Sequence, residues 1–166
     1  MLSPKTLTTV ERLIAHLTAQ SQTLATAESC TGGLLGASIT HYAGTSAIYM
    51  GGINAYSNEL KEAALSVPKD LMIAHGAVST NVAQAMAAHL RDLSDADWGL
   101  GITGVAGPGG GTADKPVGMV CFAIVGKNST QKVWTKQFAG SRGEVRDQAV
   151  EEAALGLLSL LDAPAP

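Results

Sequence analysis

Hydrophobic and polar positions recur along this chain with two periods, one typical of helices and one typical of strands. Apolar residues at helical spacing follow the capping pair Ser3-Pro4 and, further on, the caps at 79–81, which predicts helices over about 4–17 and 82–93. Shorter segments between these helices follow the same two periods. In chain order they predict a strand at 23–27, a helix at 33–40, a strand at 47–56, helices at 58–67 and 69–74, and a strand at 98–103.

The second half of the chain begins with a glycine-rich loop over 104–116. Two apolar stretches after it, 117–125 and 132–138, predict a hairpin. A last helix is expected to open at Ser141, which forms a capping-box pattern with Glu144. Because strands and helices alternate in the first half, we predict an α/β fold, a single three-layer α/β/α domain over the whole chain with a mixed central sheet.

Composition and charge narrow the classes of partner. Hydrophobic residues make up 46 % of the chain and charged residues 15 %, which is typical of a well-buried globular protein. The net charge is −3 and no run of lysines and arginines occurs, so nucleic acid and an anionic membrane surface are not favoured as partners. A neutral or anionic small molecule stays open, because a local basic pocket can lie within a mildly acidic chain.

Cysteine usage and hydropathy indicate where the protein works. Cys30 and Cys121 form no CxxC pair, which is typical of a reducing compartment. The amphipathic N-terminal segment lacks the apolar core of a signal peptide, and the longest apolar run, 117–125, is too short to cross a bilayer. We therefore expect a cytoplasmic protein without a membrane partner, whose apolar content allows a homodimer or a higher homo-oligomer.

The first candidate site is the sequence ATAESCTGG, in which the nucleophilic side chains of Ser29, Cys30 and Thr31 precede Gly32 and Gly33. A predicted strand ends here and a helix begins, and open α/β sheets bind ligands at this edge. The amides of Thr31, Gly32 and Gly33 are expected at the helix N-terminus, where they can hold an oxyanion or a phosphate. The residues alone equally allow a simpler interpretation, in which Thr31 only caps the helix.

The second candidate is Lys61 in the sequence YSNELK. If Asn58 caps the helix, Lys61 falls in the first turn, where the helix dipole disfavours a cation. Lowering a lysine pKa from about 10.4 to about 7 requires roughly 4–5 kcal/mol, whereas the dipole supplies about 0.3–1 kcal/mol. Desolvation must provide the rest, so the residues alone leave an ordinary solvated lysine as the simpler alternative.

The glycine-rich loop and the start of the last helix form a third candidate. Thr103, Gly104 and the loop amides, including those of Gly107 and Gly109, can form an anion-binding nest. Arg142 can add a charge-assisted hydrogen bond to the same anion. The alternative is a tight strand connection with an exposed arginine.

Two other patterns are interpreted as structural. GLGITG matches the GxGxxG of dinucleotide sites, but neither a helix nor an acidic residue follows at the required distance. The four histidines show no metal-ligand spacing, and His75 in the turn HGAVS receives no chemical role. We expect neither a metal nor a cofactor.

Five segments, in chain order, resemble the C-terminal domain family of the competence/damage-inducible protein CinA. The resemblance covers about residues 8–160, and the segments are AESCTGG, AYSNELK, HGAVS, GITGVAGPGGGTADKPVG and FAGSRGEVR. It implies an amidohydrolase, because the stand-alone members are nicotinamide-nucleotide amidases, which convert nicotinamide mononucleotide to nicotinic acid mononucleotide and ammonia. The implied partner is a small nucleotide substrate. Longer members carry an additional N-terminal domain, for which this chain leaves no room.

The resemblance maps the family's serine onto Ser29, its lysine onto Lys61 and its tyrosine onto Tyr56. Neutral Lys61 takes the Ser29 proton, the alkoxide attacks the carboxamide carbon, and the amides of 31–33 hold the oxyanion. Cys30 is the alternative nucleophile, but alternation along a strand places it on the opposite face from Ser29. The competing function is a non-catalytic module that binds a phosphorylated small molecule.

Overall fold

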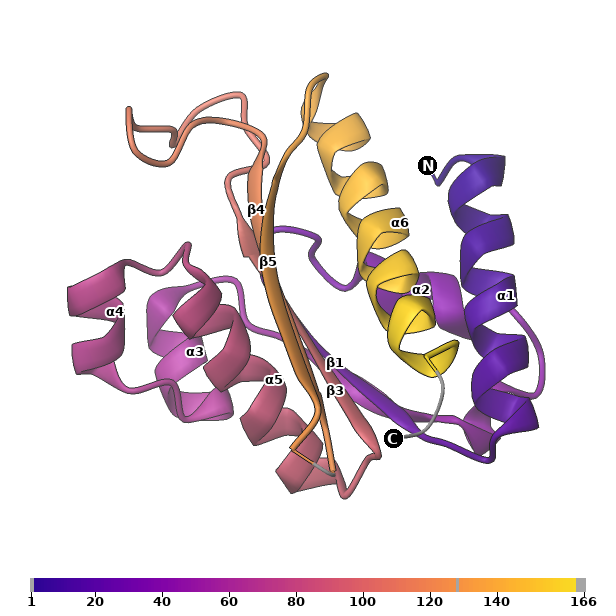
Figure 1. The fold of residues 1–166 in the computed structure, drawn as a ribbon. Coiled ribbons are helices and arrows are strands. Elements are labelled where there is room, and N and C mark those ends of the chain that lie inside the picture. The colour runs from indigo at the N-terminus through magenta and orange to yellow at the C-terminus, as the bar shows by residue number, and fades with distance from the viewer. Residues whose placement is uncertain (1, 128, 164–166) are drawn as a thin grey trace.

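The computed structural model describes residues 2–127 and 129–163 and places a five-stranded sheet between two layers of helices (Figure 1). The predicted helices and strands are confirmed, with bounds that shift by two residues or fewer. In chain order the elements are α1 (Pro4–Ala19), β1 (Leu24–Glu28), α2 (Leu34–Thr40), the short 3₁₀ helix η1 (Thr45–Ala47), β2 (Tyr49–Asn54), α3 (Asn58–Leu65), α4 (Lys69–His75), α5 (Thr80–Ser94), β3 (Trp98–Gly104), β4 (Met119–Gly126), β5 (Gln131–Gln137) and α6 (Arg142–Leu161).

The sheet is mixed, as predicted. Its strand order is β2-β1-β3-β4-β5, with β2, β1 and β3 parallel and the β3–β4 and β4–β5 pairs antiparallel. The chain leaves β1 through α2 to reach β2 on one side, and then returns through α3, α4 and α5 to β3 on the other side. The topological switch point of the sheet therefore lies at the carboxyl ends of β1 and β3.

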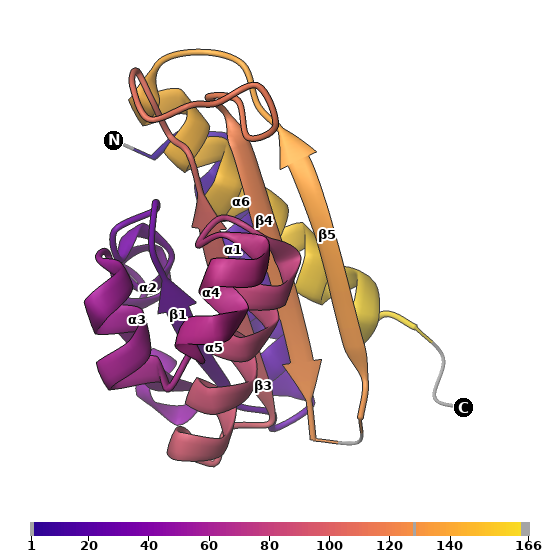
Figure 2. The same ribbon diagram turned by 90° about the vertical axis from the view of Figure 1, so that its left-hand side faces the viewer.

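Helices cover both faces of the sheet, which confirms the three-layer α/β fold. α1, α2 and α6 lie on one face, and α3, α4 and α5 lie on the other (Figures 1 and 2). The strand β4 serves both layers, because its side chains alternate: Phe122 and Ile124 belong to the core under α1 and α6, whereas Cys121 and Ala123 pack with residues of α5.

Two glycines of β3 let α5 lie close against the sheet. A Cβ on Gly99 would lie 2.1 Å from the Ala87 carbonyl oxygen, and one on Gly101 would lie 2.1 Å from the Ala83 carbonyl oxygen. No other residue leaves the helix room to approach this closely. The GLGITG segment therefore serves helix–sheet packing, and β3 continues into a loop and not into a helix.

Side-chain caps open the helices largely as the sequence predicts. The Ser141 hydroxyl accepts the Glu144 N–H, and the Glu144 carboxylate accepts the Ser141 N–H, so the capping box is present at the start of α6. The cap of α3 is Ser57 and not Asn58, since Ser57 Oγ accepts a backbone N–H of the first turn at 3.1 Å. Lys61 lies in that first turn all the same.

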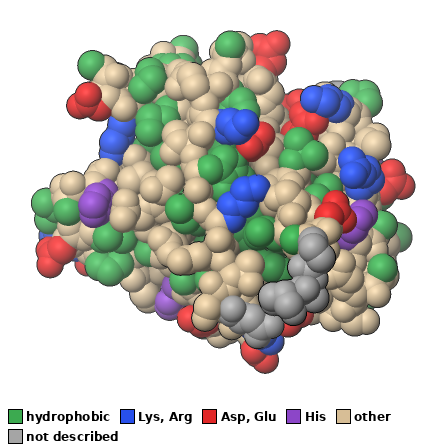
Figure 3. Space-filling view, viewed as in Figure 1, with side chains coloured by type: hydrophobic (Ala, Val, Ile, Leu, Met, Phe, Trp, Pro, Cys, Tyr) green, Lys and Arg blue, Asp and Glu red, His purple; other side chains and the backbone are tan. Residues whose placement is uncertain are grey.

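The surface carries charges of both signs. On the face of the molecule seen in Figure 3, lysine and arginine side chains are interspersed with aspartate and glutamate, and small apolar groups lie between them. None of the helices within 2–127 and 129–163 combines the length and the hydropathy that a bilayer crossing requires.

Candidate active site

A cleft of about 250 Å³ opens at the carboxyl ends of β1 and β3, which is the switch point of the sheet. Its walls come from segments far apart in the chain: the turn after β1, the start of α3, the turn before α5, the end of β3 and the start of α6. The residues that line it are Ser29, Cys30, Tyr56, Asn58, Lys61, Ala77, Val78, Thr103, Gly104, Ala106 and Arg142. The structure thus brings together these residues of the sequence analysis: Ser29, Tyr56, Lys61, Thr103, Gly104 and Arg142.

Ser29 and Cys30 both line this cleft, and the strand alternation from which we expected them on opposite faces does not extend to them. β1 ends at Glu28, one residue later than predicted, and neither Ser29 nor Cys30 belongs to the strand. Both lie in a turn that is closed by a hydrogen bond of 3.0 Å from the Gly32 N–H to the Ser29 carbonyl. Strand alternation does not apply in a turn, so it cannot decide which of the two is the nucleophile.

The ionisation of Cys30 separates the two candidates. Its side chain belongs to the main hydrophobic core, and burial raises the pKa of the thiol to about 12. The backbone amides of Cys30 and Thr31 and the charge of Lys61 favour the thiolate, but desolvation outweighs them. Near neutral pH the sulfur is therefore protonated and is a weak nucleophile.

Lys61 is buried, with 2 % of its surface exposed. Its Nζ donates to the Tyr56 carbonyl oxygen at 3.3 Å. Desolvation lowers the pKa of the amine, while the charge of Glu59 acts in the opposite direction. The ordinary solvated lysine, which the residues alone allowed, is therefore excluded.

Ser29 and Lys61 line the same cleft, but no hydrogen bond joins Ser29 Oγ to Lys61 Nζ in the described ranges. Lysine carries its amine on a flexible four-carbon stem. Hydrogen bonds between catalytic groups are often long before the substrate binds and tighten in the complex.

Tyr56 and Arg142 form the rim of the cleft. Arg142 donates from Nη2 to the Tyr56 hydroxyl at 3.0 Å and from Nη1 to the Gly107 carbonyl oxygen at 2.8 Å. The side chain of Tyr56 is otherwise turned to solvent, with 61 % of the residue exposed. Arg142 thus connects the start of α6 to the glycine-rich loop and to the segment before α3, and its guanidinium keeps further N–H donors for an anion.

The segment HGAVS supplies part of the wall, a role that sequence reasoning missed. Ala77 and Val78 line the cleft, and Thr103 Oγ1 donates to the Ala77 carbonyl oxygen at 2.9 Å. Lys115, from the glycine-rich loop, donates to the His75 carbonyl oxygen at 2.5 Å. His75 therefore contributes to the cleft wall through its backbone carbonyl. The segment HGAVS holds the side chains of Ala77 and Val78 against the end of β3.

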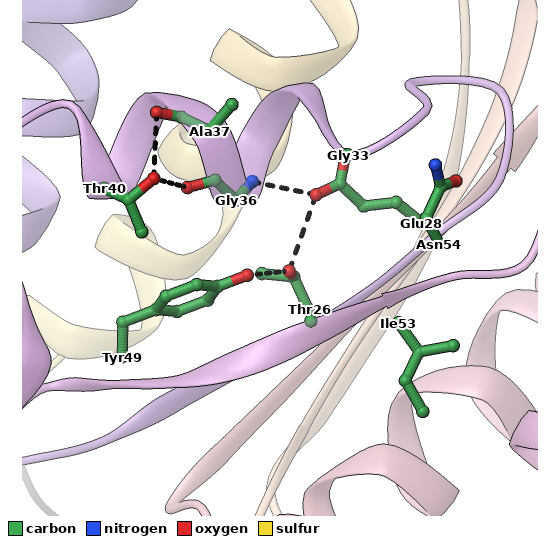
Figure 4. A pocket seen from close by; sticks show the side chains of 10 residues that line it. Thr26, Glu28, Gly33, Gly36, Ala37, Thr40, Tyr49, Ile53 and Asn54 are labelled. Carbon is green, nitrogen blue, oxygen red and sulfur yellow. Dashed lines mark hydrogen bonds between the residues drawn. The ribbon is translucent and has the colours of Figure 1, made fainter.

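Helix α2 does not offer the free N-terminus that the sequence predicted. The amide of Leu35 donates to the carboxylate of Glu28 at 3.0 Å. The amide of Gly36 donates to the same carboxylate at 2.8 Å (Figure 4). Glu28 directly precedes Ser29, has 2 % of its surface exposed and was missed by sequence reasoning. An internal carboxylate thus occupies the place at which an oxyanion or a phosphate was expected, because a helix start attracts negative charge.

Gly32 and Gly33 therefore do not take the oxyanion-binding role expected of them. The Gly32 N–H is used within the turn, and Gly33 lines a separate pocket of about 160 Å³ beside Glu28 (Figure 4). Thr31 also lies outside the cleft lining. Of this turn, only Ser29 and Cys30 line the cleft, and the residues that follow them hold the turn in place.

The glycine-rich loop takes part in the cleft only at its beginning. Ala106 lines the cleft and Gly107 contacts Arg142, whereas Gly109 is exposed and lies outside the lining. The expected role of Gly109 in an anion-binding nest is therefore corrected. Within the described part of the chain, the amides of Ala106 and Gly107 donate no hydrogen bond, which leaves them available to an anion at the rim.

The cleft lining contains two basic side chains and no acidic one. The basic side chains belong to Lys61 and Arg142. A local basic pocket thus lies within a chain of net charge −3. Among the residues that the structure describes, no three His, Cys, Asp or Glu side chains lie together in a group that could hold a metal ion.

Comparisons with known proteins find relatives of the whole domain. Residues 6–161 match the CinA C-terminal domain family. A CinA-like protein of Synechococcus sp. (strain CC9902) is 54 % identical over 122 residues, which are 74 % of this chain and 29 % of that protein. A CinA-like protein of Anaeromyxobacter sp. (strain K) is 47 % identical over 150 residues, which are 90 % of this chain and 36 % of that protein. The chain thus spans about a third of the length of these relatives.

Solved structures of similar proteins share the fold. The competence/damage inducible protein CihA from Agrobacterium tumefaciens has a TM-score of 0.93 at 34 % identity, over 96 % of this chain and 98 % of its own. A competence-damaged protein (CinA) superfamily protein from Escherichia coli has a TM-score of 0.89 at 33 % identity, over 96 % of this chain and 94 % of its own. The resemblance drawn from the five sequence segments is therefore confirmed.

Proposed function

This chain belongs to the CinA C-terminal domain family, and on that premise we propose that it hydrolyses the carboxamide of nicotinamide mononucleotide. The products are nicotinic acid mononucleotide and ammonia. The observation that carries the proposal is the burial of Lys61 in the same cleft as Ser29. A desolvated amine beside a hydroxyl is able to activate that hydroxyl as a nucleophile without a metal.

In the first half of the reaction, neutral Lys61 accepts the proton of the Ser29 hydroxyl while Oγ attacks the carboxamide carbon. The carbonyl oxygen takes the negative charge in the tetrahedral intermediate. Collapse of the intermediate re-forms the carbonyl and breaks the C–N bond. The departing nitrogen takes the proton that Lys61 holds, with the Tyr56 hydroxyl as a relay, and an acyl ester remains on Ser29.

In the second half, water enters the cleft and attacks the ester carbon while Lys61 accepts one of its protons. The ester bond then breaks, and Ser29 Oγ recovers its proton from Lys61. The substrate amide and one water are thereby converted to the acid and ammonia. Ser29 and Lys61 return to their starting states, so the cycle needs no other reactant.

The oxyanion donor in this mechanism is the amide of Cys30. Cys30 directly follows Ser29 and lines the cleft, and its N–H donates no backbone hydrogen bond within residues 2–127 and 129–163. The amide that follows a nucleophilic serine holds the oxyanion in other hydrolases as well. This assignment replaces the glycine amides of the turn, because the Gly32 N–H donates to the Ser29 carbonyl oxygen and Gly33 lies outside the cleft lining.

The substrate phosphate is assigned to the rim of the cleft. Arg142 keeps unpaired N–H donors there, and the amides of Ala106 and Gly107 are available beside it. The absence of a carboxylate from the lining favours an anionic substrate over a neutral or cationic one. We therefore expect the nucleotide to be a better substrate than its uncharged fragment nicotinamide.

Ammonia release from nicotinamide mononucleotide tests this function on the wild type and on three variants. Ser29→Ala and Lys61→Ala are expected to lose roughly 10⁴-fold or more in kcat, as removal of a nucleophile or its base does elsewhere. Cys30→Ala is expected to stay within about tenfold, because the thiol packs in the core and does not react. The exposed residues Ser159 and Lys5 supply matched controls, Ser159→Ala and Lys5→Ala, which should leave the rate unchanged.

Two results would replace the proposal. Saturable binding of nicotinamide mononucleotide by the wild type without ammonia release would establish a non-catalytic binding module. Loss of activity in Cys30→Ala together with full activity in Ser29→Ala would assign the nucleophile to the thiol.

A further inference from the structure

Arg146 reaches the turn that carries Ser29 without lining the cleft. It lies on α6, one helical turn after Arg142. Its Nε and Nη2 both donate to the Thr31 carbonyl oxygen, at 3.2 and 2.7 Å. One arginine of α6 therefore faces the cleft, and the next one on the same helix holds the backbone behind the nucleophile.

The contact acts on one peptide group that is held at both ends. The guanidinium holds the carbonyl oxygen of Thr31, and the N–H of the same peptide group, which is that of Gly32, donates to the Ser29 carbonyl at 3.0 Å. Because a peptide group is planar, fixing its oxygen also fixes the direction of its N–H. Hydrogen bonds in such a chain also strengthen one another. Arg146 is thus one peptide group away from the backbone of Ser29.

The sequence of the turn leaves room for this guanidinium. Gly32 has a φ of +61°, and a Cβ at this position would lie 3.3 Å from Arg146 Nη2. Glycine adopts the left-handed conformation without strain and lets the planar group approach the backbone. Gly33, the second glycine of the segment AESCTGG, is not needed for this contact. Only Gly32 lies next to the Arg146 guanidinium.

Among the residues that the structure describes, the Arg146 guanidinium forms no ion pair, because no carboxylate oxygen lies within 4.0 Å of its nitrogens. The other end of the turn is held by Glu28, which accepts the first amides of α2. The turn that carries Ser29 is thus fixed by one charged side chain at each end.

We propose that Arg146 is a positioning residue that holds Ser29 Oγ in its reactive geometry through the Thr31–Gly32 peptide group. This role rests on the proposed function only in taking Ser29 as the nucleophile. Arg146 does not touch the substrate, so its loss should slow the chemical step and leave substrate binding in place. Arg142, on the rim, should show the opposite pattern.

Steady-state kinetics with nicotinamide mononucleotide separate the two arginines. Arg146→Met keeps the stem and removes the donors, and kcat is expected to fall about 10- to 100-fold, as small misplacements of reacting groups cost elsewhere. KM should stay within about twofold. Arg146→Lys should recover part of the loss, and it also serves if Arg146→Met does not fold. Arg142→Met should raise KM, and Arg12→Met, at an exposed arginine of α1, should change nothing.

Covalent labelling gives a readout that needs no turnover. Phenylmethanesulfonyl fluoride is expected to modify Ser29 of the wild type, as located by peptide mass spectrometry and abolished in Ser29→Ala. In Arg146→Met the labelling rate should fall at least tenfold while circular dichroism stays native. If the wild type is labelled but releases no ammonia, the amidase function fails and the positioning role stands. Equal labelling rates in wild type and Arg146→Met, or a rise in KM without a loss of kcat, overturn the positioning role.

Discussion

At the scale of single residues, the burial of Lys61 opposes the stability of the fold. Desolvation lowers the pKa of its amine below the ordinary value of 10.5. At a pH below the folded-state pKa, folded and unfolded chains both carry the ammonium, and the folded chain bears the full desolvation penalty. The penalty declines as the pH rises through the window between the two pKa values, and it is absent above 10.5.

Replacing Lys61 by methionine should therefore stabilise the protein while it abolishes activity. Lys61→Met keeps the length of the side chain and removes the buried charge, so the melting temperature at pH 7 should rise by about 2–4 °C for each kcal/mol recovered. The difference from the wild type should shrink as the pH approaches 10.5. Thermal unfolding followed by circular dichroism measures both effects, with Lys5→Met as the exposed control. A melting temperature below that of the wild type at pH 7 would contradict this reasoning.

At the scale of elements, the buried carboxylate of Glu28 stabilises the start of α2, which follows the turn that carries Ser29. Two backbone N–H groups depend on it, those of Leu35 and Gly36. Glu28 is also linked to the neighbouring strand β2 through Thr26 (Figure 4). Thr26 Oγ1 donates to Glu28 Oε1 at 3.5 Å, and the same hydroxyl forms a hydrogen bond of 2.6 Å with the Tyr49 hydroxyl. Loss of the carboxylate therefore leaves buried donors without an acceptor.

Glu28→Gln should destabilise the fold by about 1–3 kcal/mol, the usual penalty of a buried hydrogen-bonding group left unpaired. The amide offers one acceptor oxygen where the carboxylate offers two, and its NH₂ group faces the helix N–H groups. Urea unfolding measures the change, and an unchanged m-value would show that the two-state transition is preserved. The exposed Glu62 supplies the control Glu62→Gln, and equal stabilities of the two variants would refute the role given to Glu28.

The packing of α5 on β3 gives a second prediction at this scale. In Gly101→Ala the new methyl carbon meets the backbone carbonyl of Ala83, which cannot move away as a flexible side chain does. We expect a loss of about 1–3 kcal/mol or more in the free energy of unfolding. Gly109→Ala is the matched control, because a Cβ there meets no atom within 4 Å. Equal unfolding midpoints in urea for the two variants would be incompatible with the close helix–sheet contact.

The elements themselves were predictable, whereas their ends were not. Periodicity identifies β1, because a buried strand of apolar and small residues differs from the helices around it. It does not show how the turn after β1 is folded, and this turn brings both Ser29 and Cys30 into the lining of the cleft. Nor does it show that Glu28 is buried, because the partners of its carboxylate are backbone amides, which leave no pattern in the sequence.

At the scale of the whole molecule, the cleft exists because the strand order places β3 directly beside β1. Local sequence predicts each strand but not which strands are its neighbours in the sheet. That Thr103 and Ser29 line the same cleft could therefore not be predicted from periodicity. The environment of Lys61 is likewise long-range, since Cys30, Ala77 and Thr103 line the same cleft. The resemblance to the CinA C-terminal domain family supplied the pairing of Ser29 with Lys61, and the fold supplies the burial that the pairing needs.

The pH dependence of kcat/KM for nicotinamide mononucleotide tests most directly whether the fold deprives Lys61 of water and of charge. This quantity reports the ionisation of the free enzyme. We predict that kcat/KM rises with pH through an apparent pKa clearly below 10.5, because the proposed base is the neutral amine and burial lowers its pKa. A rising limb centred at 10.5 or above would show that the amine is solvated and would contradict the account.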